Sequence, residues 1–255
     1  MARSKRYREY LVFLILALII LTSVITWGIY AGWYLPVDWE NPEPFYLEGG
    51  SIHRVNGSLI LNYERHSIEY VPLNKMPDNL ANAFIAIEDS RFYQHRGVDL
   101  IGIFRAMFAN IQSGEVVQGG STITQQLARN LFLDHRRTME RKMAEISIAL
   151  QLERRYTKDQ IMEMYLNQIY FGDGNWGVSQ AAQAYFNKDA ASLTLAEAAV
   201  LAGLVQSPST YTPIRGWTLA MARQKVVLNR MVELNFITLE EAEKAVLTEP
   251  VPLGN

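Results

Sequence analysis

The sequence predicts a mostly helical fold with one small β-hairpin, and three observations support this class. Apolar residues recur at helical spacing from about residue 76 onward, and four segments open with a helix-capping pattern. A single stretch alternates around a turn dipeptide in the manner of a hairpin. Of the 255 residues, 49% are hydrophobic and 20% are charged, a composition that excludes general disorder and allows a sizeable core.

The N-terminal segment predicts a membrane anchor. Four cations lie within residues 1–10, and residues 10–37 form a run of 28 without charge. Because about 20 apolar residues cross a bilayer, we expect 1–10 to be a cytoplasmic tail and 11–35 to be a single transmembrane helix. The basic end of such a helix stays in the cytoplasm, which places the rest of the chain outside. A cleaved signal peptide is the alternative, although its apolar region is usually only about 7–15 residues long.

Residues 36–75 are expected to form a linker and the hairpin. Three prolines and the pair Gly49–Gly50 are typical of a linker in the first part of this range. Residues 51–63 alternate between apolar and polar side chains around Asn56–Gly57, which predicts two short antiparallel strands. No other strand is expected.

Residues 76–235 are expected to form the main, helical domain, followed by a C-terminal helix and tail at 236–255. In the first helix of this domain, Leu80, Phe84 and Ile87 fall on one face.

Four later helices are predicted to begin at capping boxes, in which Ser or Thr is followed three residues later by Glu or Gln. The second of these helices is expected to continue to Phe171 and to end at Gly172. The four boxes are Thr122 with Gln125, Thr157 with Gln160, Thr194 with Glu197, and Thr238 with Glu241.

Composition and the absence of certain motifs exclude several classes of function. Beyond the predicted anchor the chain carries 20 Lys and Arg against 25 Asp and Glu, a mildly acidic balance that argues against nucleic acid as a partner. The count of zero cysteines excludes disulfides, thiolate metal sites and cysteine nucleophiles. The sequence contains no HExxH or EF-hand metal motif, and no Ser-x-x-Lys acylation motif.

The first candidate site is the segment 88–95, which gathers two carboxylates, a histidine and two aromatic residues. Glu88 follows Ile87 at the buried edge of the predicted helix. Desolvation there would raise the pKa of the carboxyl group toward that of a useful base. The alternative is an exposed helix end, with Glu88 paired to Arg91 three residues later.

A second candidate is the loop Gly119-Gly120-Ser121-Thr122, which precedes a capped helix. A helix N-terminus attracts anions, and the Gly-Gly pair permits unusual backbone angles. The loop lacks the Gly-x-x-x-x-Gly-Lys pattern of a nucleotide-binding loop, and a plain loop with a cap is the alternative. The helix after it carries polar groups suited to sugar hydroxyls and phosphates, namely Gln125, Gln126, Arg129 and Asn130.

The third candidate is a basic region within an otherwise acidic domain. Residues 129–158 carry eight cations and four carboxylates. Arg141, Lys142 and Glu145 lie on one helical face, where two cations beside one carboxylate could hold a diphosphate. A solvated charged face and a patch that binds the membrane surface are the alternatives.

Together these residues resemble the peptidoglycan glycosyltransferases, as found in monofunctional transglycosylases and in class A penicillin-binding proteins. The resemblance covers about Val71 to Pro213. Its first three motifs are Glu88, Asp89, Phe92, His95 and Gly97; Gly119 to Leu127 with Arg129 and Asn130; and Arg141, Lys142 and Glu145. The fourth and fifth motifs are Tyr165 to Asn167 running into Tyr170 to Gly172, and Gly177 with Ala181, Ala182, Tyr185 and Phe186.

The resemblance implies a lysozyme-like domain with a small membrane-proximal jaw at the bacterial cytoplasmic membrane. It implies polymerisation of lipid II into β-1,4-linked glycan with inversion and release of undecaprenyl diphosphate. Glu88 would be the base and Glu145 would assist the leaving group. The implied partners are lipid II, the growing glycan and other cell-wall synthesis proteins. A divalent cation assists some members of the family, and no cofactor is required by this sequence.

Two alternative functions fit the sequence. A lytic enzyme that cleaves the same glycan could also use two carboxylates, although it would have no diphosphate for the basic face to hold. A non-catalytic membrane-tethered scaffold would need neither Glu88 nor Glu145. Residues 235–253 resemble the stretch that leads into a transpeptidase domain in bifunctional proteins, so the chain is either a monofunctional enzyme or part of a longer one.

Overall fold

A computed structural model describes residues 69–115, 119–133, 138–214 and 216–248, with shorter pieces at 19, 22–23, 26–27, 37–40 and 136 and the backbone of 50–55 and 58–63. Most of the predicted transmembrane helix and the end of the predicted tail lie outside these residues. In the described part of the chain, no helix is both long and apolar enough to cross a membrane.

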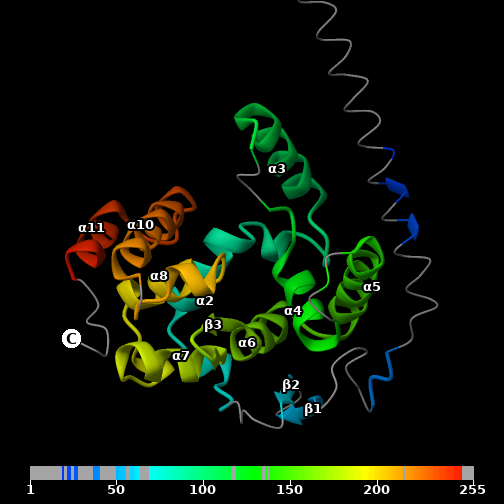
Figure 1. Ribbon diagram of the computed structural model, residues 1–255, viewed down its shortest axis with the longest axis horizontal. Helices are drawn as coiled ribbons and strands as arrows, with labels where there is room; N and C mark the ends of the chain where they lie inside the picture. Colours follow the sequence, from blue (N-terminus) through cyan, green and yellow to red (C-terminus); the bar gives the residue numbers. More distant parts are fainter. Residues whose placement is uncertain are drawn as a thin grey trace, which may run out of the picture.

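The described body is mostly helical, as predicted (Figure 1). Besides its α-helices, the described body contains short turns of 3-10 helix and two small sheets. The α-helices are α2 (Asp78–Glu88), α3 (Leu100–Ser113), α4 (Ile123–Phe132), α5 (Met139–Arg155), α6 (Lys158–Gln168), α7 (Gly177–Phe186), α8 (Leu195–Leu204), α9 (Pro208–Tyr211), α10 (Trp217–Glu233) and α11 (Leu239–Leu247). The 3-10 turns are Leu73–Lys75, Phe92–Gln94 and Ala190–Ser192.

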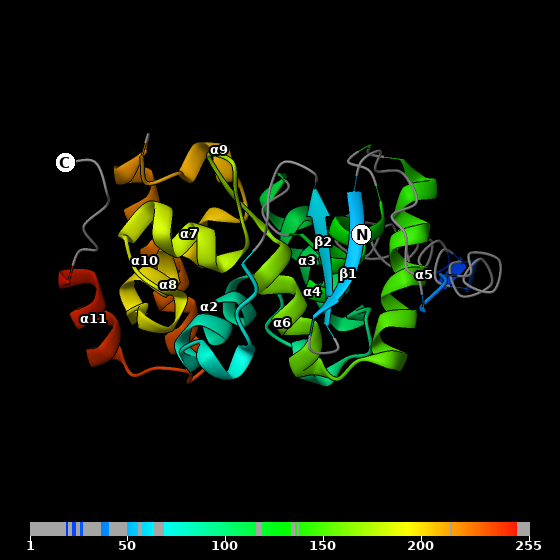
Figure 2. The same ribbon diagram turned by 90° about the horizontal axis from the view of Figure 1, so that it is seen from below.

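The predicted hairpin is confirmed. Strands β1 (Gly50–Val55) and β2 (Ser58–Tyr63) pair in antiparallel fashion, and Val55 opposite Ser58 leaves a two-residue connection at the expected Asn-Gly position. Strand β2 lies beside α6, so the hairpin is attached to the helical body (Figure 2).

A second sheet shows that the expectation of a single hairpin was wrong. Helix α6 ends at Gln168 rather than at Phe171, and β3 (Tyr170–Gly172) then pairs with β4 (Asn175–Trp176). The reversal passes through Asp173, whose φ of 49° lies in the left-handed region. Strands of three and two residues are too short to show an alternating pattern, which is why sequence periodicity missed them.

All four predicted capping boxes are present. In α4, for example, Thr122 Oγ1 accepts from the Gln125 N–H at 3.1 Å while Gln125 Oε1 accepts from the Thr122 N–H at 2.9 Å. The same reciprocal pair begins α6, α8 and α11. Each pair satisfies two backbone N–H groups that a helix end would otherwise leave without a partner. These boxes therefore define where the chain enters its helices.

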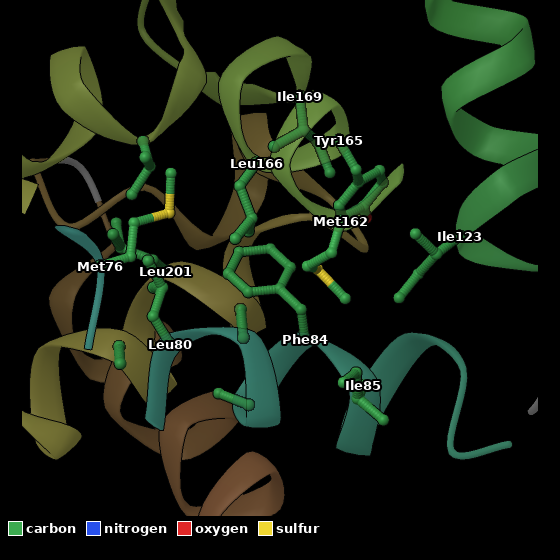
Figure 3. Packing of buried hydrophobic residues seen from close by; sticks show 14 of the residues in the cluster. Met76, Leu80, Phe84, Ile85, Ile123, Met162, Tyr165, Leu166, Ile169 and Leu201 are labelled. Atoms are coloured by element: carbon green, nitrogen blue, oxygen red, sulfur yellow. The ribbon is translucent and has the colours of Figure 1, made fainter. Parts of the chain in front are cut away.

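The core forms around Phe84 on the buried face of α2. Its ring meets the rings of Tyr165 and Phe171 edge-on, with centroids 5.9 and 6.0 Å away. Figure 3 shows Phe84 pointing from α2 toward Leu166 and Met162 of α6. Helix α2 also packs against α8 and α10, while α4 packs against α5 and α6. The candidate catalytic residues from Glu88 onward therefore follow a helix that is packed against other elements on several sides.

Helix α3 projects from the rest of the body (Figure 1). It has several exposed large apolar side chains, which is unusual for a helix in contact with water. They are Leu100, Ile101, Phe108 and Ile111.

Candidate active site

A cavity of about 620 Å³ opens at the C-terminal end of α2. One wall is the end of α2 with Glu88 and the residues that follow it, and a second is the loop that leads to Thr122. Helix α10 supplies the third wall through Arg223, Asn229 and Glu233. The cavity therefore joins the first two candidate segments, which lie about thirty residues apart in the sequence.

Glu88 is held at this cavity by α4. Its Oε2 atom accepts a hydrogen bond of 2.6 Å from Gln126 Nε2. Desolvation by burial raises the pKa of Glu88, and it outweighs the opposing effects of the Gln126 hydrogen bond and the positive charges of Arg223 and Arg129. Arg91 instead pairs with Asp99 at 3.2 Å, so the alternative Glu88–Arg91 pair is replaced. The result is a carboxyl group suited to accept a proton.

Asp89 and His95 form a buried pair behind Glu88. His95 Nε2 lies 2.9 Å from both Asp89 oxygens. Asp89 Oδ2 also accepts from the Ile123 N–H at 3.1 Å, at the start of α4, where the helix dipole favours a negative charge. Thr122 Oγ1 donates to the Gly97 carbonyl oxygen at 2.6 Å. These contacts fasten the first candidate segment to the loop before α4.

Lys142 connects that loop to the third candidate. Its Nζ donates to Ser121 Oγ at 2.9 Å and also to Glu145. Arg141 Nη1 donates to the second oxygen of Glu145 at 3.0 Å. Glu145 is fully buried, which contradicts the alternative of a solvated face. Burial lowers the pKa of Lys142, and the negative charge of Glu145 partly opposes this shift.

Arg129, on α4, acts electrostatically on both halves of the site. Its charge lowers the pKa of Glu88, and it also contributes to lowering the pKa of Lys142. Both effects require proximity, so α4 presents a cation to each of the two carboxylate-bearing regions. Asn130, which follows Arg129 at the end of α4, is partly buried.

Some predicted site residues contribute to packing or helix capping rather than to the wall of the cavity. Phe92 is fully buried, and Lys158 Nζ lies 4.4 Å from the centre of its ring. Gln125 is used by the capping box of α4. Gly119, Gly120, Ser121 and Thr122 all line the cavity. Arg141, Lys142 and Glu145 do not line it, although Lys142 contacts the lining residue Ser121.

Sequence reasoning missed the contribution of α10. Arg223 faces the region of Glu88 closely enough for its charge to lower the pKa of that carboxyl group. Arg230 lines the same cavity two turns later. The spacing of seven residues between these arginines puts them on one helical face, and this spacing can be recognised in the sequence. Only the folded chain, however, brings this face to Glu88.

The described residues do not assemble a metal centre. Among them, no group of three or more His, Asp or Glu side chains is placed to hold a metal ion.

Comparisons with known proteins agree with the motifs. Penicillin-binding protein 1A of Aquifex aeolicus is 44% identical over 218 residues, covering 83% of this chain and 30% of that protein. Penicillin-binding protein 1A of Escherichia coli is 48% identical over 193 residues, covering 76% of this chain and 23% of the relative. A crystal structure of penicillin-binding protein 1A from Haemophilus influenzae aligns with 78% of this chain and 20% of its own, at 26% identity and a TM-score of 0.45.

The chain thus spans less than a third of the length of these curated relatives. A family profile described as Transglycosylase matches residues 56–232. That match extends past Pro213, the C-terminal limit of the sequence resemblance, and includes nearly all of α10. The chain therefore belongs to the transglycosylase family.

Proposed function

We propose that the protein is a peptidoglycan glycosyltransferase that polymerises lipid II into β-1,4-linked glycan strands and releases undecaprenyl diphosphate. The observation that carries the proposal is Glu88, a carboxyl group with a raised pKa that Gln126 orients at the cavity. Membership of the transglycosylase family supports the reaction class.

Glu88 acts as the general base in the proposed reaction. Its carboxylate takes the proton from the 4-hydroxyl group of the acceptor sugar as that oxygen attacks the anomeric carbon of the donor. The bond from the anomeric carbon to the diphosphate breaks on the opposite side, so the configuration inverts from α to β. A base whose pKa is closer to the working pH is better matched to such a transfer.

The cationic group supports departure of the diphosphate. Arg141 and Lys142 are held by the buried carboxylate of Glu145, and Lys142 reaches Ser121 at the edge of the cavity. Cations that are already oriented stabilise developing negative charge without further reorganisation. Glu145 is thus proposed to orient the two cations rather than to move a proton.

A lipid-linked substrate requires a site close to the bilayer. We propose that residues 11–35 anchor the chain in the cytoplasmic membrane with the catalytic body on the outer face. Helix α3, with exposed Phe108 and Ile111, would form the membrane-proximal jaw of the lysozyme-like domain. Other cell-wall synthesis proteins are proposed partners at this location.

One assay tests the proposal and separates it from the lytic alternative. The full chain is incubated with lipid II in one reaction and with finished glycan strands in another. We expect the wild-type chain to grow glycan from lipid II and the Glu88→Gln variant to lose this activity. Shortening of finished strands without growth from lipid II would favour the lytic reading, and no turnover of either substrate would remove both.

A further inference from the structure

The four residues Val37–Glu40, which follow the expected membrane anchor, are folded onto the helical body. Val37 and Trp39 are each only 6% exposed, whereas Asp38 and Glu40 are exposed. The Glu40 N–H donates to Asp38 Oδ1 at 2.9 Å, a local turn of the kind that Asp favours. The bend leaves the two carboxylates in solvent and turns the two apolar side chains inward.

Trp39 is held by several distinct contacts. Its ring meets that of Phe132 edge-on at 5.9 Å and that of Tyr156 at 6.2 Å. The guanidinium carbon of Arg155 lies 5.1 Å from the centre of the Trp39 ring. The indole N–H points at Gln151 Oε1 at 3.4 Å. A side chain fixed by aromatic, cationic and polar contacts together has a defined docking site.

These contacts converge on the two helices that carry the candidate active site. Gln151 and Arg155 lie one turn apart on α5, the helix of Arg141, Lys142 and Glu145. Phe132 is the last residue of α4, whose first turn follows Ser121 and Thr122. Figure 2 shows the described piece of chain (blue) beside α5.

The docked segment is very close to the expected anchor. If residues 11–35 span the membrane, Pro36 alone separates the anchor from Val37. Two Cα–Cα steps reach no further than about 7.6 Å. The region expected to be a linker therefore begins with a segment that is attached to the body. With the anchor ending at residue 35, a single residue connects the bilayer-spanning segment to the body.

We propose that Trp39 is a positioning residue that fastens the end of the membrane anchor to α5 and so sets the height and orientation of the active site above the lipid surface. This inference rests on the proposed function, because a fixed height matters for a substrate held in the same bilayer. A tether raises the effective concentration of two partners only when its geometry lets the sites meet. A small misplacement of the reacting groups is costly in rate.

Two insertions of equal length test the docking point without changing any buried residue. Six Gly/Ser residues are inserted either after Pro36, between anchor and docked segment, or after Asn41, beyond it. Polymerisation of lipid II is measured with the full chain in vesicles, and in detergent with a short-chain, water-soluble lipid II analogue. We expect the insertion after Pro36 to lower the vesicle rate about tenfold and the insertion after Asn41 to leave it within about twofold. Equal rates for the two insertions in vesicles would overturn the inference.

Point variants test Trp39 itself. Trp39→Ala is expected to lower the vesicle rate about tenfold and to leave the rate on the soluble analogue within about twofold, whereas Trp39→Phe restores most of the vesicle rate. Trp176→Ala is the matched control, because Trp176 packs on Tyr170 at 4.8 Å in the small second sheet. It is expected to lower thermal stability and to affect both assays equally. An equal fractional loss in both assays for Trp39→Ala would make Trp39 merely structural and contradict the inference.

The activity of the wild-type chain separates failure of the proposed function from failure of the proposed role of Trp39. A wild-type chain that polymerises neither substrate removes the proposed function. A wild-type chain that polymerises both, with Trp39→Ala matching it in vesicles, leaves the proposed function standing and removes the role of Trp39.

Discussion

The ammonium group of Lys142 lies between two oxygen-bearing groups, donating to Ser121 Oγ at 2.9 Å and to the buried carboxylate of Glu145. This one side chain joins the loop before α4 to the face of α5. The arrangement puts a cation at the edge of the cavity and fixes it from behind by an opposite charge. In the proposed reaction, such preorganisation would stabilise the departing diphosphate.

The proposed role of Glu88 as general base predicts a specific kinetic defect. In Glu88→Gln the amide keeps the shape of the side chain and cannot accept the proton, so the polymerisation rate should fall about 10²- to 10⁴-fold. Binding of a non-reacting donor analogue should survive. Rate and binding are measured in parallel for the same preparation, and a near-normal rate would eliminate Glu88 as the base.

The contact between Gln126 and Glu88 predicts a change in pH dependence. The hydrogen bond from Gln126 lowers the pKa of Glu88, against the larger raising effect of burial. Without that bond, in Gln126→Ala, the pKa of Glu88 should rise further. A base is active when deprotonated, so the acid limb of the kcat/KM profile should move to higher pH. Gln125→Ala, which removes a cap on the same helix, is the control that should weaken folding without moving the limb.

The same raised pKa predicts a stability gain in an inactive variant. A carboxyl group whose pKa is higher in the folded than in the unfolded state favours folding below its unfolded pKa, and this contribution is lost as the pH rises through the folded value. At neutral pH the partly desolvated charge of Glu88 therefore costs stability. Glu88→Gln should melt at a higher temperature than wild type near pH 7, and the difference should vanish in acid. Thermal melts across pH check this, and a lower melting temperature at neutral pH would contradict it.

The absence of an acylation motif predicts that this chain does not react with penicillin. The 255-residue sequence contains no Ser-x-x-Lys motif, so no serine is placed beside a lysine that would activate it. A labelled β-lactam should be absent from the protein after denaturation and gel separation. Label that persists through denaturation would show a nucleophile that the sequence does not reveal.

Local signals predicted the fold well where they were strong. The four capping boxes located the starts of α4, α6, α8 and α11 because reciprocal hydrogen bonds within three residues do not depend on the rest of the fold. The turn between β3 and β4 has Gly172, Asp173 and Gly174 at positive φ, a local turn signal, but the strands on either side are too short to show periodicity. Their pairing depends on packing of Tyr170 against Trp176. Short strands of this kind are decided by tertiary contacts.

The candidate site was predictable in its parts and less so in its assembly. Spacing along a helix placed Lys142 and Glu145 together, because residues three apart face the same way. The approach of Arg223 to the end of α2 depends on how α10 packs, and nothing local to either segment encodes it. Sequence reasoning also treated the region of Trp39 as linker, although its ring is buried against α4 and α5.

The last prediction concerns Glu145 and its effect on Lys142. Burial and the nearby charges of Arg129 and Arg141 lower the pKa of Lys142, whereas Glu145 raises it. In Glu145→Gln the raising effect is lost, so Lys142 should lose its proton at lower pH. Because a neutral amine holds a diphosphate less well, donor affinity and rate should fall together, by about 10- to 100-fold if one charge-assisted hydrogen bond is lost.

The alkaline limb of the rate profile distinguishes this mechanism from simple loss of structure. In Glu145→Gln the limb should move to lower pH, and adding Lys142→Arg should restore it, because an arginine stays charged. Glu153→Gln is the matched control: Glu153 lies on the same helix and pairs with Lys158 at 2.7 Å. It should lower stability and leave the limb in place. Unchanged donor affinity, rate and alkaline limb in Glu145→Gln would remove Arg141, Lys142 and Glu145 from the proposed mechanism.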